Sequence, residues 1–127
     1  MTTQNIPPVG MHALLDLFGI DAAVACNEAL ICQHLHQAAQ LAEATVLQSH
    51  FHHFGENMGV TGVLLLSESH ISIHTWPEYQ FAAVDIFICG KHQIEIAAHF
   101  LKTAFSAQDF SLKFEHRGNE IHLPQQK

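Results

Sequence analysis

The spacing of apolar residues along this chain predicts several strands and two helices. From Gly10 to Leu17, polar and apolar residues alternate, which is typical of a strand with one buried face. Residues 45–54, 60–66, 70–76, 81–89 and 110–114 are also rich in strand-forming residues. The alanine-rich stretch 21–44, with Asp21 as a candidate N-cap, has helical spacing, and so do residues 94–105.

The order of these elements predicts the fold class. One strand is followed by a helix, several consecutive strands, a second helix and a last strand. This order is typical of an α+β fold, here a two-layer sandwich of a mainly antiparallel sheet with two long helices on one face. Because the other face of such a sheet would stay open, we expect a homodimer formed through the sheet edge or this open face.

The composition favours one folded domain over residues 1–127. Of the 127 residues, 48% are apolar and only 13% are charged, which favours a packed core over disorder. The chain starts without a basic and apolar leader, contains no apolar run of membrane-spanning length, and has three cysteines without a disulfide framework. We therefore expect a cytoplasmic protein that does not bind membranes, with frayed ends at residues 1–9 and 122–127.

The charge balance and the histidine content bear on possible partners. A formal net charge of −7 repels phosphates, so nucleic acid is not an expected partner. The twelve histidines raise the alternative of a non-catalytic metal-binding module, because His50 and His52 would share one strand face beside His53. Against this alternative, His34 and His36 are two residues apart on a helix and do not face each other.

The segment LSESHISIHTWPEYQFAAVDIFICG, residues 66–90, places many polar side chains on or beside two strands. Such side chains indicate either a solvated sheet face or a functional site, because a buried polar group needs a partner. A hairpin symmetric about Tyr79 would place Cys89 directly opposite Ser69, although the loop length leaves the register open. Ser69 and His74 are five residues apart, so strict alternation puts them on opposite faces unless a bulge or a turn intervenes.

The run SESHISIHTWPE followed by AAVDIFICG closely resembles the self-cleaving core of the prokaryotic S-adenosylmethionine decarboxylases, the pyruvoyl-dependent enzymes of spermidine synthesis. The likeness extends more weakly to Gly10, His12 and Asp16 and to FHHFGENMGVTG, and so covers nearly the whole chain. The resemblance implies a carboxy-lyase that acts on S-adenosylmethionine and yields the aminopropyl donor for spermidine.

The same resemblance implies a proenzyme that cuts itself between Glu68 and Ser69 into fragments 1–68 and 69–127. The Ser69 hydroxyl would attack the Glu68 carbonyl, and elimination followed by loss of ammonia would convert Ser69 into a pyruvoyl group. This group would form a Schiff base with the substrate amine and accept the electrons released with CO₂. The cofactor is then made from the chain, and neither PLP nor a metal is expected.

Other roles follow from the resemblance position by position. His74 matches the histidine that acts as the base in the elimination, a role suited to a side chain that titrates near neutrality. Cys89 matches the thiol that reprotonates the decarboxylated carbon. Thr61 stands where many relatives have a serine that supports processing, and it keeps the hydroxyl.

Three further residues are candidates for binding the substrate. Glu78 matches a carboxylate that binds ribose hydroxyls, Phe54 is a candidate for stacking on adenine, and Trp76 is a candidate pocket wall. His70 and His12 are possible neighbours of the site. The same chemistry on arginine or ornithine is an alternative function, but Glu78 and Phe54 suit a nucleoside better than a simple amino acid.

Overall fold

The computed structural model of this chain describes residues 4–5, 10–118 and 122–123. The described elements, in chain order, are β1 (Gln4–Asn5), β2 (Gly10–Phe18), α1 (Ala22–Ala25), α2 (Glu28–Leu41), β3 (Val46–His53), β4 (Val60–Leu66), β5 (Ser69–Trp76), the 3₁₀ turn η1 (Pro77–Tyr79), β6 (Phe81–Ile88), α3 (Lys91–Ala104), β7 (Asp109–Arg117) and β8 (His122–Leu123). The strands expected from the sequence are present with small shifts at their ends, and so is the second helix, whereas the first expected helix is divided into α1 and α2.

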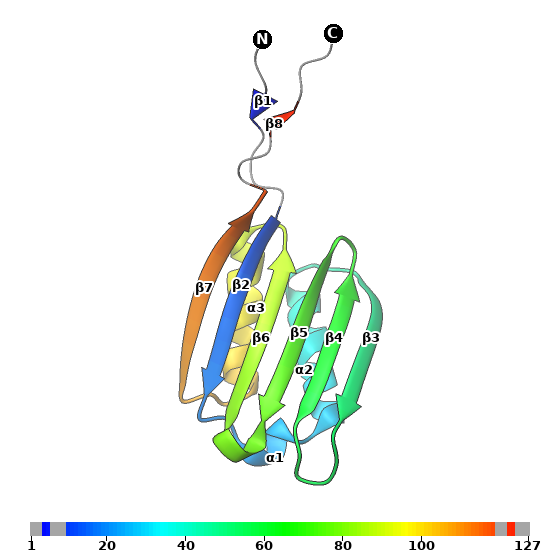
Figure 1. Ribbon diagram of the computed structural model, residues 1–127, viewed down its shortest axis with the longest axis vertical. Coiled ribbons are helices and arrows are strands. Elements are labelled where there is room, and N and C mark those ends of the chain that lie inside the picture. Colours follow the sequence, from blue (N-terminus) through cyan, green and yellow to red (C-terminus); the bar gives the residue numbers. More distant parts are fainter. Residues whose placement is uncertain (1–3, 6–9, 119–121, 124–127) are drawn as a thin grey trace.

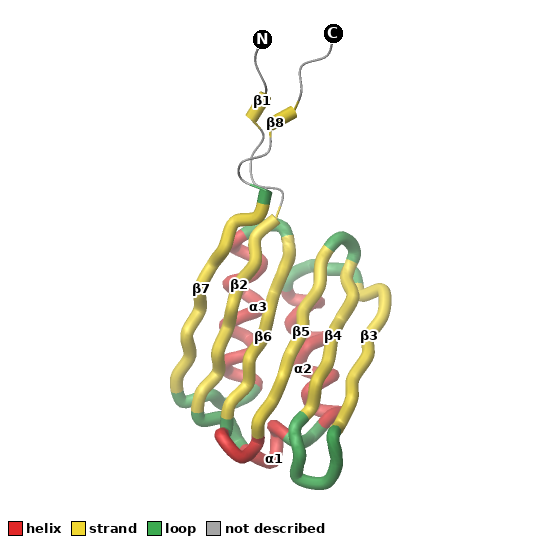
Figure 2. The backbone as a smooth tube through the Cα atoms, in the orientation of Figure 1, coloured by secondary structure: helices red, strands yellow, loops and turns green. Residues whose placement is uncertain are grey.

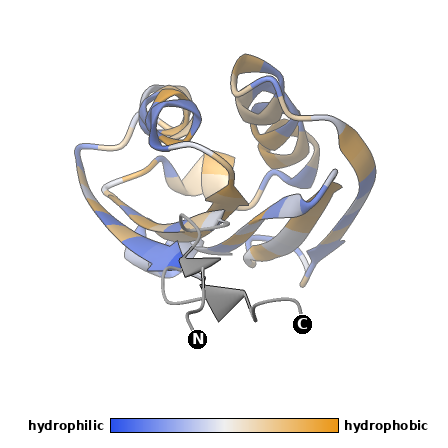
Figure 3. Ribbon diagram, turned by 90° about the horizontal axis from the view of Figure 1, so that it is seen from above, coloured by the Kyte–Doolittle hydropathy of each residue, from blue (hydrophilic) through white to orange (hydrophobic). Residues whose placement is uncertain are grey.

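Six of the strands form one open sheet in the order β3-β4-β5-β6-β2-β7, and every neighbouring pair is antiparallel (Figure 1). Helices α2 and α3 lie side by side on one face of this sheet, as Figures 2 and 3 show. The expectation of a two-layer α+β fold is therefore confirmed. No helix in the described part of the chain is long and apolar enough to cross a membrane.

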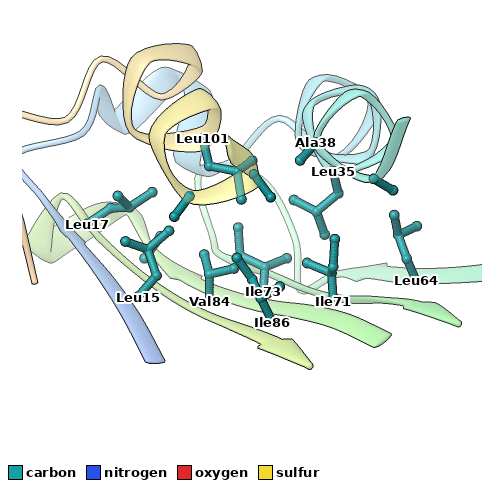
Figure 4. Close-up of a cluster of buried hydrophobic side chains, with 14 of the residues drawn as sticks. Leu15, Leu17, Leu35, Ala38, Leu64, Ile71, Ile73, Val84, Ile86 and Leu101 are labelled. Atoms are coloured by element: carbon teal, nitrogen blue, oxygen red, sulfur yellow. The ribbon is translucent and has the colours of Figure 1, made fainter. Parts of the chain in front are cut away.

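The core lies between the helices and the inner face of the sheet (Figure 4). In β2, Ala13, Leu15 and Leu17 are fully buried, whereas Leu14 and Phe18 are each 41% exposed, as the alternation of a strand requires. Strands β4, β5 and β6 and both long helices contribute buried side chains to the same core, among them Leu35, Ala38, Leu64, Ile71, Ile73, Val84, Ile86 and Leu101. The described helices leave the outer face of the sheet uncovered (Figure 3).

The long helix expected over residues 21–44 is in fact interrupted. The Asp21 side chain caps α1 by accepting the N–H of Ala23, but α1 ends at Ala25. The Asn27 side chain then accepts the N–H of Leu30 and caps α2 as a new helix. An asparagine competes with the helical backbone for such hydrogen bonds, so it ends one helix and begins the next.

Two tight turns set the geometry of β5. Ser67 and Glu68 form the turn between β4 and β5, and Glu68 has the left-handed φ of 61°. At the other end, η1 and Gln80, whose φ is 49°, connect β5 to β6. Both turns use a non-glycine residue in a conformation that costs about 1–2 kcal/mol.

The frayed ends expected at residues 1–9 and 122–127 fall largely outside the described residues. Where the structure describes these segments, β1 pairs with β8 in a two-stranded antiparallel sheet.

Candidate active site

Ser69 begins β5 directly after the tight turn. Its hydroxyl donates a hydrogen bond to the Ser67 carbonyl at 3.2 Å, which directs the hydroxyl back toward the turn formed by Ser67 and Glu68. A cavity of about 280 Å³ at this end of the sheet is lined by Ser67, Glu68, Ser69, Ile88 and Cys89, together with residues 42–45. The structure therefore brings Glu68 and Ser69, between which cleavage is expected, and Cys89 to one cavity.

The expected pairing of Cys89 directly opposite Ser69 is wrong by one residue. The ladder between β5 and β6 pairs His70 with Phe87, which leaves Ile88 in line with Ser69 and Cys89 just beyond the strand. The cause is the connection from Pro77 to Gln80, an even number of residues that centres the hairpin between Glu78 and Tyr79. Cys89 is exposed where it lines the cavity.

At the other end of the β4–β5 hairpin, Thr61 pairs with His74. The Thr61 hydroxyl lies 3.1 Å from His74 Nδ1, within hydrogen-bond distance. The His74 ring also lies beside Trp76, with the ring centroids 6.2 Å apart, and Trp76 packs on Phe81. The histidine is therefore oriented by a hydroxyl on one side and an aromatic ring on the other.

The candidate substrate-binding residues gather around this histidine. A cavity of about 340 Å³ is lined by Phe54, Met58, Gly59, Thr61, His74, Thr75, Trp76 and Glu78. It combines aromatic side chains with one carboxylate, that of Glu78. Glu78 lies in η1 and is exposed. Five of the residues singled out from the sequence meet here, although they come from a loop, two strands and a turn.

Ser69 and His74 do not meet within one chain. They occupy opposite ends of the same strand, about 16 Å apart at roughly 3.3 Å per residue. The register of β5 runs unbroken from Ser69 to Trp76, so no bulge brings the two side chains to one face. The turn at Ser67 and Glu68 precedes Ser69 without changing this register, and the candidate residues form two separate groups.

The open face of the sheet carries a polar cluster between these two groups. Asp85 accepts a hydrogen bond from the Ser72 hydroxyl at 3.2 Å, and its other oxygen lies 3.3 Å from His12 Nε2. His70 stacks on Phe87, with the ring centroids 5.8 Å apart. His70 and His12 thus lie on the same outer face as His74.

Exposed apolar side chains surround this cluster. Leu14, Phe18, Leu65 and Trp76 stand on the outer face and are 38–46% exposed. An apolar surface of this kind is typical of an interface.

Sequence reasoning missed two parts of these cavities. Met58 lies within the stretch FHHFGENMGVTG but had no assigned role, and the segment 42–45 after α2 had no signal at all. The one signal for Met58 in the sequence was its position four residues after Phe54, the candidate for stacking on adenine. Within residues 4–5, 10–118 and 122–123, no group of three or more His, Cys, Asp or Glu side chains could hold a metal ion, so the metal-binding alternative gains no support there.

The fold and the two cavities define an α+β protein whose chemistry-bearing residues lie at both ends of one β-hairpin. The family model for S-adenosylmethionine decarboxylase matches residues 11–118. The S-adenosylmethionine decarboxylase proenzyme of Synechococcus is 44% identical over 106 residues, which cover 83% of this chain and 82% of that protein. The proenzyme of Thermotoga maritima is 40% identical over 120 residues, which cover 92% of each chain.

A solved structure agrees with these sequence relatives. The crystal structure of the adenosylmethionine decarboxylase from Aquifex aeolicus superposes with a TM-score of 0.85 at 34% identity, covering 95% of this chain and all of that chain. This chain belongs to the S-adenosylmethionine decarboxylase family. The resemblance identified from the sequence is therefore confirmed, and the alternatives of an arginine or ornithine decarboxylase and of a metal-binding module are not supported.

Proposed function

We propose that this protein is a self-processing, pyruvoyl-dependent carboxy-lyase that decarboxylates S-adenosylmethionine. The observation that carries the proposal is the Glu68–Ser69 peptide bond, which lies in a tight turn beside Cys89 in a chain that matches the family over residues 11–118. The product is the aminopropyl donor for spermidine synthesis. A cytoplasmic location belongs to the same proposal, since three cysteines suit a reducing compartment.

Processing uses only groups of the protein and one water molecule. The Ser69 hydroxyl attacks the Glu68 carbonyl, and the C–N bond breaks to leave an ester and a free amine. A base then removes the α-proton of Ser69, which expels the Glu68 carboxylate and leaves a dehydroalanine. Its tautomer, an imine, reacts with water and releases ammonia. The fragment that begins at residue 69 then carries a pyruvoyl group at its N-terminal end.

The residues at the Ser69 end fit this group. The cavity next to Ser69 has room beside the scissile bond, and it holds the Cys89 thiol as a proton donor for the carbon that loses CO₂. A pyruvoyl carbonyl supplies an electrophile that holds an amine covalently and accepts an electron pair. The N-terminal end of fragment 69–127, which cleavage creates, would lie within reach of Cys89.

The residues at the His74 end suit a nucleoside with a positive charge. Glu78 accepts hydrogen bonds from both ribose hydroxyls, Phe54 stacks on the base, and Trp76 offers an aromatic face to the sulfonium. The net charge of −7 favours the approach of such a cation. His74, oriented by Thr61, acts as the base in the elimination.

Because these two groups lie about 16 Å apart along β5, the proposal includes a homodimer with shared sites. In a symmetric dimer that buries the two open sheet faces, the Ser69 end of one protomer can meet the His74 end of its partner. The exposed apolar residues on that face, Leu14, Phe18, Leu65 and Trp76, support this mode of association.

Intact-mass analysis and CO₂ release test the activity. The purified protein should give fragments 1–68 and 69–127, the second lighter by one ammonia than a serine-ended peptide and modified by a carbonyl-trapping reductant. The Ser69→Ala variant, which keeps the fold but lacks the nucleophile, should stay uncleaved. A single uncleaved wild-type chain, or CO₂ released from arginine or ornithine but not from S-adenosylmethionine, would refute the proposal.

Co-expression of two inactive variants tests the shared site. His74→Ala keeps Ser69, and Ser69→Ala keeps His74, so a mixed dimer restores one complete site. We expect cleavage of the His74→Ala chain only when the Ser69→Ala chain is present. A pair in which both chains carry His74→Ala is the matched control, and equal processing in the two pairs would contradict sharing.

A further inference from the structure

The loop between β3 and β4, residues 54–59, presents two apolar side chains at the cavity that contains His74. Phe54 is 55% exposed and Met58 is 53% exposed, and both line this cavity together with Glu78. Two exposed apolar side chains that line one cavity form a small apolar patch, which is available to contact another molecule.

Three hydrogen bonds fix the path of the loop. His53 Nε2–H donates to the Met58 carbonyl at 3.1 Å, a bond made by the Nε2-protonated neutral ring or by the imidazolium. The N–H of Met58 donates to the Gly55 carbonyl at 2.9 Å, and the N–H of Phe54 donates to the Gly59 carbonyl at 3.1 Å. Both the N–H and the carbonyl of Met58 are therefore hydrogen-bonded, the carbonyl by the His53 side chain.

Packing fixes both ends of the loop as well. A Cβ at Gly59 would collide with the Thr75 carbonyl oxygen, so the loop base sits directly on β5. The Met58 Sδ folds over Gly55, 3.9 Å from the place of a Cβ there. The Phe54 ring packs edge-on against His52, with the centroids 4.6 Å apart.

We propose that Met58 and Phe54 form a clamp for the adenine ring and that His53 is the positioning residue that holds Met58 in it. This inference rests on the proposed function, because it names the residues that recognise the nucleoside end of the substrate. A thioether and an aromatic ring are a suitable pair of walls, since both interact favourably with the face or edge of a flat π-system. His53 does not itself line the cavity and acts only through the loop.

Steady-state kinetics on four variants test the clamp. In Met58→Ala we expect the KM for S-adenosylmethionine to rise about 3- to 10-fold, the range of one sulfur–aromatic contact, with kcat and the extent of self-cleavage unchanged. His53→Phe keeps a ring but cannot donate, and it should raise KM in the same direction. His53→Gln places an amide N–H near the position of Nε2 and should restore KM, while His92→Phe on the exposed start of α3 should change nothing.

The double variant His53→Phe/Met58→Ala tests whether the two residues act together. Because His53 acts through Met58, the double variant should bind no more weakly than Met58→Ala alone. Additive losses would overturn the positioning role of His53, and so would a His53→Gln variant that behaves like His53→Phe. An unchanged KM in Met58→Ala, or a fall of kcat in its place, would overturn the clamp.

Adenosine binding separates this inference from the proposed activity. Titration calorimetry with adenosine needs no turnover, and we expect Met58→Ala to weaken its binding by the same factor as the KM, while binding of methionine does not change. A wild-type protein that releases no CO₂ from S-adenosylmethionine refutes the activity, and the adenosine titration still decides the clamp. Equal adenosine affinity in wild type and Met58→Ala would refute the clamp alone.

Discussion

Thr61 and His74 face each other across β4 and β5, with the Thr61 hydroxyl 3.1 Å from His74 Nδ1. When the Nδ1–H donates to this hydroxyl, the lone pair of Nε2 stays available to accept a proton. The pairing is therefore compatible with the tautomer that a basic histidine needs.

Removing this hydroxyl should slow self-cleavage. We expect Thr61→Val to reduce the rate of fragment formation about 10-fold, a part of the 10²- to 10⁴-fold that a positioned base contributes. The rate is followed by mass spectrometry after synthesis of the precursor. Thr61→Ser is the matched control and should process like the wild type, and equal rates for Thr61→Val would contradict the role of the hydroxyl.

The left-handed conformation of Glu68 predicts strain next to the scissile bond. In an uncleavable Ser69→Ala background, Glu68→Gly should raise the free energy of unfolding by about 0.5–1 kcal/mol, because glycine adopts this φ without steric cost but loses more entropy on folding. Urea unfolding measures the change. Ser67→Gly, at the turn position outside the left-handed region, should stabilise nothing.

The same strain predicts an effect on processing. Cleavage frees Glu68 from its left-handed conformation, so a chain that keeps Ser69 and carries Glu68→Gly should process about 2- to 5-fold more slowly, the equivalent of 0.5–1 kcal/mol. A time course of fragment formation measures the rate. Faster processing of Glu68→Gly would show that the strain does not assist the reaction.

Thr75 is expected to be a strong determinant of stability. Its buried hydroxyl donates to the Ala25 carbonyl at 2.6 Å and accepts the N–H of Val60 at 2.8 Å, joining α1 to the sheet. Thr75→Val leaves both backbone groups without this partner, so we expect a loss of about 2–4 kcal/mol in the free energy of unfolding. Thr75→Ser keeps both bonds and should lose less than half as much in the same urea titration.

His34 predicts that stability falls on the acid side of neutrality. Burial lowers the pKa of His34 from its ordinary value of 6.5, partly opposed by Gln37, and its ring packs edge-on against Phe105 between α2 and α3. The unfolded chain therefore binds this proton more readily than the folded chain does. Stability contributed by neutral His34 is present above pH 6.5 and is lost as the pH falls through the lowered pKa.

The His34→Leu variant isolates this contribution. Urea unfolding between about pH 8 and pH 5 should show a steeper loss of stability in the wild type than in His34→Leu, because only the wild type carries the buried imidazole of His34. Parallel curves for the two proteins would contradict the assignment to His34.

Local patterns were sufficient to predict most of the fold. The alternation around Leu15 places every second side chain of β2 in the core, and this signal lies within the strand itself. The break at Asn27 was missed because the apolar spacing continues across it, while one side-chain hydrogen bond to Leu30 decides the start of α2. The register of β5 against β6 was missed by one residue because the conformations of η1 and Gln80 set it.

The family was readable from the order of the residues, because the run from Ser67 to Cys89 is long and specific, and the same run supplied the candidate reactive residues. Which of these residues share a cavity depended on the folded sheet. Ser69 and His74 are five residues apart in the chain and yet lie at opposite ends of β5, whereas Phe54 and Glu78 line one cavity although 24 positions separate them. An extended strand separates residues that are close in sequence, and strand pairing brings together residues that are distant in sequence. Only the tertiary structure therefore assigns the candidate residues to two groups.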